Sequence, residues 1–227
     1  MFNYKRAFTL AEVLITLVII GVIAAISVPT IVANANQKAN ESRAKKVYST
    51  LANAMTMAKA NGADFDFEVA NDSNANMKAW YDKYLKSLIT MKTCYDKMGC
   101  WHEGDTKGLD GKNVYYNRPQ VGVGANIITA VLNDGSFINI DAYGKASIYN
   151  YFGTRITANS GLVVFFDVNG AKKPNVLGKD IYVVVFSENG VMPAWKHKSP
   201  SERKKDCSKQ GQGYSCLNNI LRGEDGK

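Results

Sequence analysis

An uncharged apolar segment near the N-terminus constrains the fold of this chain more than any other feature. No charged residue occurs from Val13 to Val32. As a helix, this segment would be about 30 Å long, which is the thickness of the hydrocarbon core of a bilayer. Two cations, Lys5 and Arg6, precede it. The segment therefore predicts one membrane-spanning helix.

One acid, Glu12, lies at the start of this segment. A carboxylate inside an apolar membrane helix is costly, and proteins seldom keep one without a partner. A simpler interpretation is that Glu12, close to Arg6 in sequence, reaches the headgroup region and stays in water. Glu12 alone is compatible with both interpretations, and the flanking sequence is needed to choose between them.

The residues around Glu12 resemble the N-terminus of type IV prepilins and type II secretion pseudopilins. A short basic leader is followed by Ala7-Phe8-Thr9-Leu10-Ala11-Glu12, and Gly21 and Pro29 lie further along the apolar run. The resemblance implies that a prepilin peptidase cuts between Ala7 and Phe8 and methylates the new amine. Ala7 departs from the family, which usually has Gly there, but a small residue still fits. The match is close over residues 1–30 and extends to the rest of the chain only in architecture.

The same resemblance implies a partner for Glu12, namely the N-terminal amine of Phe8 on a neighbouring subunit of a helical filament. Opposite charges attract strongly at low dielectric, and each is costly alone, so a subunit in the wrong register would leave both unpaired. Gly21 and Pro29 are the other expected assembly positions. The implied partners are the prepilin peptidase, an inner-membrane assembly platform and other pilin-like subunits.

Two other interpretations of this segment explain less of it. A secretory signal peptide could be cut after Ala33-Asn34-Ala35, but its apolar core is shorter than this run, and Glu12 would have no role in it. A plain signal anchor explains the length and the cations but neither Glu12 nor Pro29.

The N-terminal helix is expected to continue beyond the apolar run. Pro29 removes one backbone hydrogen bond, and a kink is expected there because Ala-rich sequence resumes at once. Apolar residues then recur at helical spacing, and Asn61-Gly62 is a good helix end. These apolar positions are Val47, Tyr48, Leu51, Met55 and Ala58. The sequence therefore predicts one kinked helix from Phe8 to Ala60, about 80 Å long.

The rest of the chain predicts an α+β head in which this helix packs on an antiparallel sheet. A second helix is expected behind a cap at Ser73 or Asn76, with apolar residues at helical spacing from Trp80 to Ile89, and residues 101–120 look irregular. Turn residues and apolar runs predict the strands, which are Ile127–Leu132, Phe137–Ile140, Leu162–Val168, Ile181–Ser187 and Val191–Trp195. The expected organisation is a leader (1–7), a transmembrane or filament-core helix (8–33), an amphipathic continuation (34–62) and a head (63–227).

The four cysteines fall into two local pairs, Cys94 with Cys100 and Cys207 with Cys216. Behind an export segment such pairs are typical of disulfides, and among the three pairings the two short loops cost the least entropy to close. A zinc site is the alternative, but the spacing within each pair exceeds the usual two to four residues.

A Gly-containing loop from Asp167 to Asp180 is the candidate cation site. Asp167, Asn169 and Asp180 offer oxygen ligands suited to calcium, and the loop loosely resembles that of calcium-binding pseudopilins. Three lysines in the loop would repel a dication, and an Asx-type turn between two strands is the alternative. No other cofactor is expected.

The remaining residues predict no enzyme. His102 and His197 belong to no nucleophile or metal motif and are expected at the surface. The net charge is +8, and a basic tail contributes to it: Lys196, Lys198, Arg203, Lys204 and Lys205. Such a cluster suits phosphates but is more often a solvated face, so nucleic acid is not the expected partner.

The sequence therefore predicts a structural subunit. We expect it in the inner membrane, with one pass and with its head in the periplasm or outside the cell. A subunit of a type II secretion-like pseudopilus is favoured because of the second helix and the Asp167–Asp180 loop. The alternative is a type IV pilus subunit, major or minor, in adhesion or DNA uptake.

Overall fold

The computed structural model describes residues 8–65, 67, 75–95, 98–114 and 127–223. The chain divides into two compact units, Met1–Ala39 and Asn40–Lys227. One helix, α1 (Leu10–Ala60), contributes to both units, and Pro29 lies inside it. The prediction of one helix across Pro29 is thus confirmed, with its start at Leu10 instead of Phe8.

In the first unit, α1 exposes its apolar side chains. Residues such as Leu14, Ile23 and Ile31 are more than half exposed. By length and composition, α1 is able to cross a membrane. Apolar surface of this extent is unfavourable in water, so this segment requires a bilayer or other apolar helices around it.

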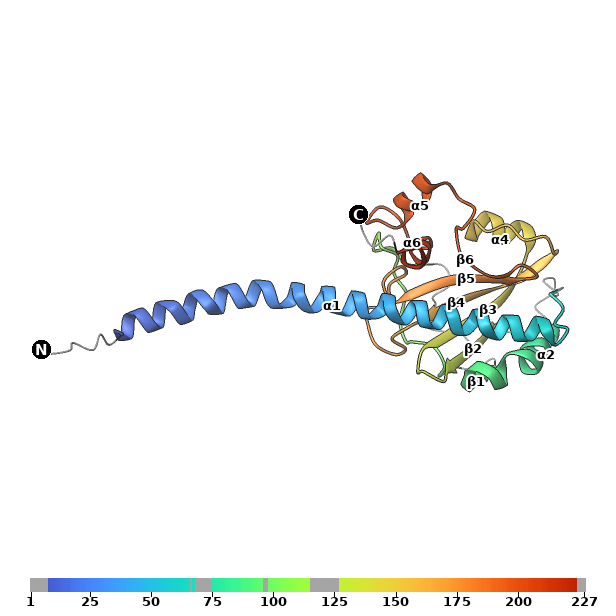
Figure 1. Ribbon diagram of the computed structural model, residues 1–227, viewed down its shortest axis with the longest axis horizontal. Helices are drawn as coiled ribbons and strands as arrows, with labels where there is room; N and C mark the ends of the chain where they lie inside the picture. Colours follow the sequence, from blue (N-terminus) through green and yellow to red (C-terminus); the bar gives the residue numbers. More distant parts are fainter. Residues whose placement is uncertain (1–7, 66, 68–74, 96–97, 115–126, 224–227) are drawn as a thin grey trace, which may run out of the picture. The chain divides into compact units, whose positions relative to one another are not determined.

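The second unit is built on a six-stranded antiparallel sheet in which each strand pairs with the next one in the chain (Figure 1). The strands are β1 (Thr90–Tyr95), β2 (Ile127–Leu132), β3 (Phe137–Gly144), β4 (Ser160–Asp167), β5 (Ile181–Ser187) and β6 (Gly190–Pro193). The tight turn between β2 and β3 includes Gly135, whose φ of 85° favours glycine. An α+β fold with a long helix on an antiparallel sheet is therefore confirmed.

One face of the sheet packs against the second half of α1 (Figure 1). The buried stripe of the helix consists of Ala44, Val47, Leu51, Ala54, Met55 and Ala58. Alternate residues of the strands, such as Ile138, Ile140 and Val164, meet this stripe, because side chains alternate between the faces of a strand. Tyr48 is half buried and donates its hydroxyl to the Val191 carbonyl at 3.0 Å. Each large apolar side chain buried here stabilises the head by about 1.5–3 kcal/mol.

The other face of the sheet is covered as well. Its core includes Val163, Phe165 and Val183 from the strands, together with Phe152 of helix α4 (Lys145–Phe152) and Trp101. Every residue of β4 and β5 is therefore buried. This explains why these two strands are continuous apolar runs, with no alternation of apolar and polar residues.

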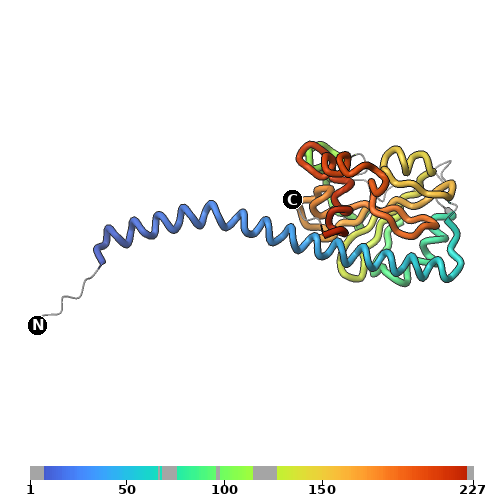
Figure 2. Tube along the Cα trace, turned by 45° about the horizontal axis from the view of Figure 1, so that its top comes forward, coloured from blue at the N-terminus to red at the C-terminus, as the bar shows by residue number. Residues whose placement is uncertain are grey.

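Two short helices near the C-terminus complete the second unit. They are α5 (Pro200–Asp206) and α6 (Cys216–Arg222). Figure 2 shows this segment beside residues 98–114, and the Leu109 amide donates to the Gln212 carbonyl at 3.2 Å. Leu217 and Ile220 of α6 belong to the same core as the buried stripe of α1.

Several elements differ from the prediction. The second helix is two helices, α2 (Ala75–Tyr84) and α3 (Lys86–Ile89), with Leu85 between them. Cys94, expected in a loop, lies in β1, whose backbone pairs with β2. β6 ends at Pro193 rather than Trp195, because the Trp195 amide donates to the Phe152 carbonyl and the chain turns away. Helices α4, α5 and α6 were not predicted.

Candidate functional site

The predicted assembly segment lies at the start of α1. Ala7 is outside the described residues, so the peptidase cut between Ala7 and Phe8 stays a prediction. Phe8 is 85% exposed. An added Cβ at Gly21 would meet no atom within 4 Å, so no packing within the chain explains this glycine. The assembly roles of Phe8, Gly21 and Pro29 stay predictions.

Glu12 forms a capping box with Thr9 at the first turn of α1. The Thr9 amide and hydroxyl both donate to Glu12 Oε2 at 2.8 Å, and the Glu12 amide donates to Thr9 Oγ1 at 3.2 Å. A Thr followed three residues later by Glu is the sequence signature of this motif, so it was recognisable but was not predicted. The box satisfies backbone donors of the helix without neutralising the carboxylate. Glu12 makes no ion pair with any residue that the structure describes.

His102 is buried, not at the surface as predicted. Its Nδ1 lies 2.9 Å from Asp167 Oδ2, and its Nε2 lies 3.0 Å from Thr106 Oγ1. An ionised Asp167 can only accept, so His102 donates to it through Nδ1–H. A neutral imidazole has one N–H, so Nε2 of His102 accepts a hydrogen bond from the Thr106 hydroxyl. Burial raises the pKa of Asp167 to about 6, and the bond from His102 opposes this shift. The three side chains join residues 98–114 to the end of β4.

This order of carboxylate, imidazole and hydroxyl resembles the activating arrangement of a hydrolase. Catalysis would require the hydroxyl to meet a substrate, yet Thr106 is 2% exposed, His102 4% and Asp167 0%. Buried polar groups that satisfy one another in this way stabilise a fold. We therefore assign this cluster a structural role.

The structure brings Asp167, Asn169 and Asp180 together at the end of β4 and the start of β5. Asp180 accepts from the Asn175 amide at 2.8 Å, the Val176 amide at 2.6 Å and Asn169 Nδ2 at 2.9 Å. Burial raises the pKa of Asp180, and these donors oppose the shift. The carboxylates of Asp167 and Asp180 thus accept hydrogen bonds from N–H groups, as expected for the alternative of an Asx-type turn between two strands.

Calcium binding in this loop stays a prediction. Within the described part of the chain, no three His, Cys, Asp or Glu side chains are arranged to hold a metal. The side-chain oxygens of Asn169 and Asn175 are buried and have no hydrogen-bond partner in the described structure. These two oxygens are the ones a cation or a water molecule would be expected to use.

Both predicted cysteine pairs are disulfide-bonded in the structure. Cys94–Cys100 ties β1 to the segment that carries His102, with a Cα–Cα distance of 5.9 Å. Cys207–Cys216 closes the loop between α5 and α6, with a Cα–Cα distance of 5.0 Å. The described residues contain no free cysteine. The first bridge thus holds an irregular segment against the sheet, and the second joins two short helices.

The basic tail is only partly a solvated face. Arg203 is buried, and its Nη1 donates to the carbonyls of Lys196 and Lys198. Arg203 thus clamps the segment before α5 and is not available to an external anion. Lys204 and Lys205 are exposed. The prediction of one continuous surface patch is wrong at Arg203, because the helix turns this side chain inward.

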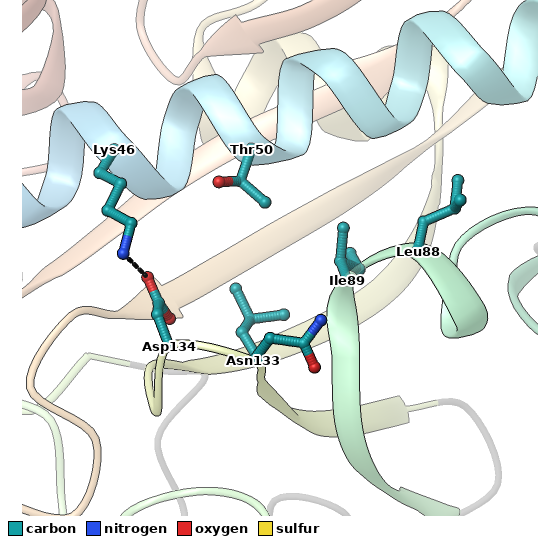
Figure 3. A pocket seen from close by; sticks show the side chains of 7 residues that line it. Lys46, Thr50, Leu88, Ile89, Asn133 and Asp134 are labelled. Carbon is teal, nitrogen blue, oxygen red and sulfur yellow. Dashed lines mark ion pairs between the residues drawn. The ribbon is translucent and has the colours of Figure 1, made fainter.

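A small cavity of about 230 Å³ lies between α1, α3 and the turn from β2 to β3 (Figure 3). Lys46 Nζ and Asp134 Oδ2, 3.7 Å apart, form an ion pair at one end of it. Apolar side chains, among them Ile89 and Leu132, line it with Thr50 and Asn133. The titratable residues of its lining, Lys46 and Asp134, pair with each other, so the cavity does not support a catalytic site.

A membrane-capable helix that continues into an α+β head defines a pilin-type architecture. Comparison with protein families gives the more specific identification: residues 2–28 match the prokaryotic N-terminal methylation motif, the prepilin-type signal of type IV pilins and pseudopilins. The motif and the fold together support a subunit of the pilin or pseudopilin type. Searches of curated proteins and of solved structures found no significant match.

Proposed function

We propose that this chain is a structural subunit of a type II secretion-like pseudopilus. The prepilin-type signal implies processing by a prepilin peptidase and assembly with other pilin-like subunits. Prepilin peptidase would cut between Ala7 and Phe8 and methylate the new amine. The exposed apolar half of α1 then anchors the precursor in the membrane and later packs against other subunits.

The observation that carries this proposal is the state of Glu12. Its carboxylate caps the helix through Thr9 but makes no ion pair with a described residue. A charge at the edge of an apolar helix is stabilised most by an opposite charge in the same low-dielectric environment. The methylated Phe8 amine of a neighbouring subunit supplies that charge, and the pairing selects the axial register of the filament.

The N-terminal mass of the mature protein, purified from membranes, tests the proposal. We expect a chain that begins at methylated Phe8. A chain that begins at Asn36 would indicate ordinary secretion, and an intact Met1 would indicate a plain membrane anchor. Either result would contradict assembly through a processed N-terminus.

The second candidate is a type IV pilus subunit, active in adhesion or DNA uptake. The disulfide loop between α5 and α6, close to the C-terminus, favours it. A pseudopilus subunit should be scarce, and its deletion should stop the export of secreted enzymes. A major pilus subunit should instead be abundant in long surface filaments, and its deletion should leave export intact.

A further inference from the structure

The head concentrates positive charge at one place. Residues 195–209 contain six basic and two acidic side chains, so about half of the net charge of +8 lies in these fifteen residues. With Arg203 buried, the charges that face outward include Lys196 and Lys198. Arg155, which follows α4, is exposed beside them. We call Tyr149, Arg155, Trp195, Lys196, His197 and Lys198 the cationic corner.

The backbone holds the cationic corner in a defined shape. The Trp195 amide donates to the Phe152 carbonyl at 2.6 Å, and the His197 amide donates to the Gly153 carbonyl at 3.1 Å. Trp195 has a φ of 60°, which is uncommon for a residue with a side chain. A Cβ on Gly153 would lie 2.8 Å from Lys198 Cγ and 3.1 Å from Trp195 Cα. The segment after β6 is thus packed tightly on the end of α4.

Aromatic rings position the cations. The Arg155 guanidinium carbon and Lys198 Nζ each lie 5.2 Å from the centre of the Tyr149 ring, and Lys198 Nζ lies 5.9 Å from that of Trp195. Such contacts hold a cation without neutralising it. The Arg155 amide donates to His197 Nδ1 at 3.0 Å, which leaves Nε2 as the other hydrogen-bonding atom of the ring.

The charge of this corner is only partly compensated. Glu202 is the acid nearest in sequence, and its Oε2 accepts from the Ser199 amide at 2.8 Å and from the Ser199 hydroxyl at 2.6 Å. Burial, with Lys196 and Arg155, lowers the pKa of His197. A hydrogen bond from Arg155 lowers the pKa of Tyr149. The contributions of the neighbouring cations to these two shifts indicate a positive local potential that an anion would relieve.

We propose that the cationic corner binds a linear carboxylated polysaccharide. Nucleic acid fits less well, because single strands need exposed aromatic faces for base stacking, whereas Tyr149 and Trp195 are half buried beneath cations. Duplex DNA gains its affinity from many phosphate contacts along a groove or stripe, and this corner is compact. A polymer with spaced carboxylates needs few cations per subunit. If the proposed filament forms, it repeats the corner, and successive subunits engage one polymer chain with added avidity.

The test uses the full chain in an uncharged maltoside detergent, so that binding does not depend on filament formation. Binding to immobilised polygalacturonate is measured at low and at physiological ionic strength, with neutral dextran as the uncharged polymer. We expect binding that weakens with salt and is absent on dextran. The variant Arg155→Gln/Lys198→Gln should bind roughly fivefold more weakly or worse.

The control variant, Lys172→Gln/Lys173→Gln, removes two exposed charges from another loop and should change binding by less than about twofold. Because Lys198 packs beside Gly153, Arg155→Gln/Lys196→Gln provides a second test in which both positions are exposed. Absence of polygalacturonate binding, or equal loss in the control, would overturn the proposal. Tighter binding of a DNA oligonucleotide, abolished by the same variants, would replace it with a nucleic-acid surface. The N-terminal mass of the same sample tests the filament function separately.

Discussion

Asp206 is predicted to be the residue on which the loop between α5 and α6 depends. It is 6% exposed and lies just before the Cys207–Cys216 bridge. Its Oδ2 accepts from the Ser215 amide at 2.7 Å, and its Oδ1 accepts from the amides of Gln212 and Gly213 at 3.3 Å. Replacement of Asp206 by Ala removes all three acceptor contacts at once.

The expected loss follows from these distances. The short bond to the Ser215 amide is charge-assisted, and a bond of this kind is worth about 1.5–3 kcal/mol. The two bonds at 3.3 Å are weaker, and the Gly213 amide keeps a second acceptor in the Asp206 carbonyl at 3.1 Å. We expect Asp206→Ala to lower the free energy of unfolding by about 2–4 kcal/mol. In a chain of this size that corresponds to a fall in Tm of roughly 10 °C.

Urea unfolding of the full chain in maltoside, followed by tryptophan fluorescence, measures this change. Lys209→Ala, an exposed position in the same disulfide loop, is the control and should stay within about 0.5 kcal/mol of wild type. Asp206→Asn keeps one acceptor oxygen and should fall between the two. If Asp206→Ala matched Lys209→Ala with the disulfide intact, water would be satisfying the Ser215 amide and the reasoning would fail.

Three further predictions concern assembly, calcium and pH. Glu12→Ala should insert and be processed but should enter filaments poorly. Thr9→Val loses the side-chain cap but keeps the charge of Glu12, so it should assemble. Equal effects of the two variants in a pull-down of assembled subunits would refute charge pairing. A calcium site in the β4–β5 loop predicts a higher Tm with excess calcium, an increase that Asp180→Asn should lose; no shift in wild type would remove the site. Burial raises the pKa of Asp141 from 3.8 to about 7, so its contribution to stability is full below about pH 4 and is lost as the pH rises through about 7. Asp141→Asn should therefore match wild type in Tm near pH 4 and exceed it near pH 8, and a constant difference across that range would contradict the assignment.

Local signals predicted much of the fold. The bounds of β2 and β5 match the predicted strands, because turn residues and dense apolar runs mark both ends. The stripe on α1 was predicted from its spacing, since a helix that packs on a sheet needs one apolar face. Two short helices also carried signals that were not used. Ser199-Pro200 followed by Glu202 is a capping box with proline at the first turn of α5, and Gly153 ends α4 in a left-handed conformation.

The buried cluster could not be predicted in the same way. His102 and Asp167 are 65 residues apart in sequence, and their contact exists only because a disulfide-tied segment lies across the end of β4. The periodicity of a sequence indicates the faces of a single helix or strand and does not predict a contact between distant segments. The burial of Arg203 could not be predicted either, because the basic residues around it in sequence do not show which of them the helix directs into the fold. Residues brought together by topology alone therefore required the structure.

The placement of α6 sets an order on the maturation of the head. Strands β1 to β6 pair in the order of synthesis, so each can join its neighbour as the chain is made. The buried stripe of α1 is made before the strands, yet its core also contains Leu217 and Ile220, which are made after all six of them. A chain made only as far as β6 therefore leaves part of that stripe uncovered. Loss of α6 should yield an aggregation-prone chain, because the core of the head is complete only once α6 has been made.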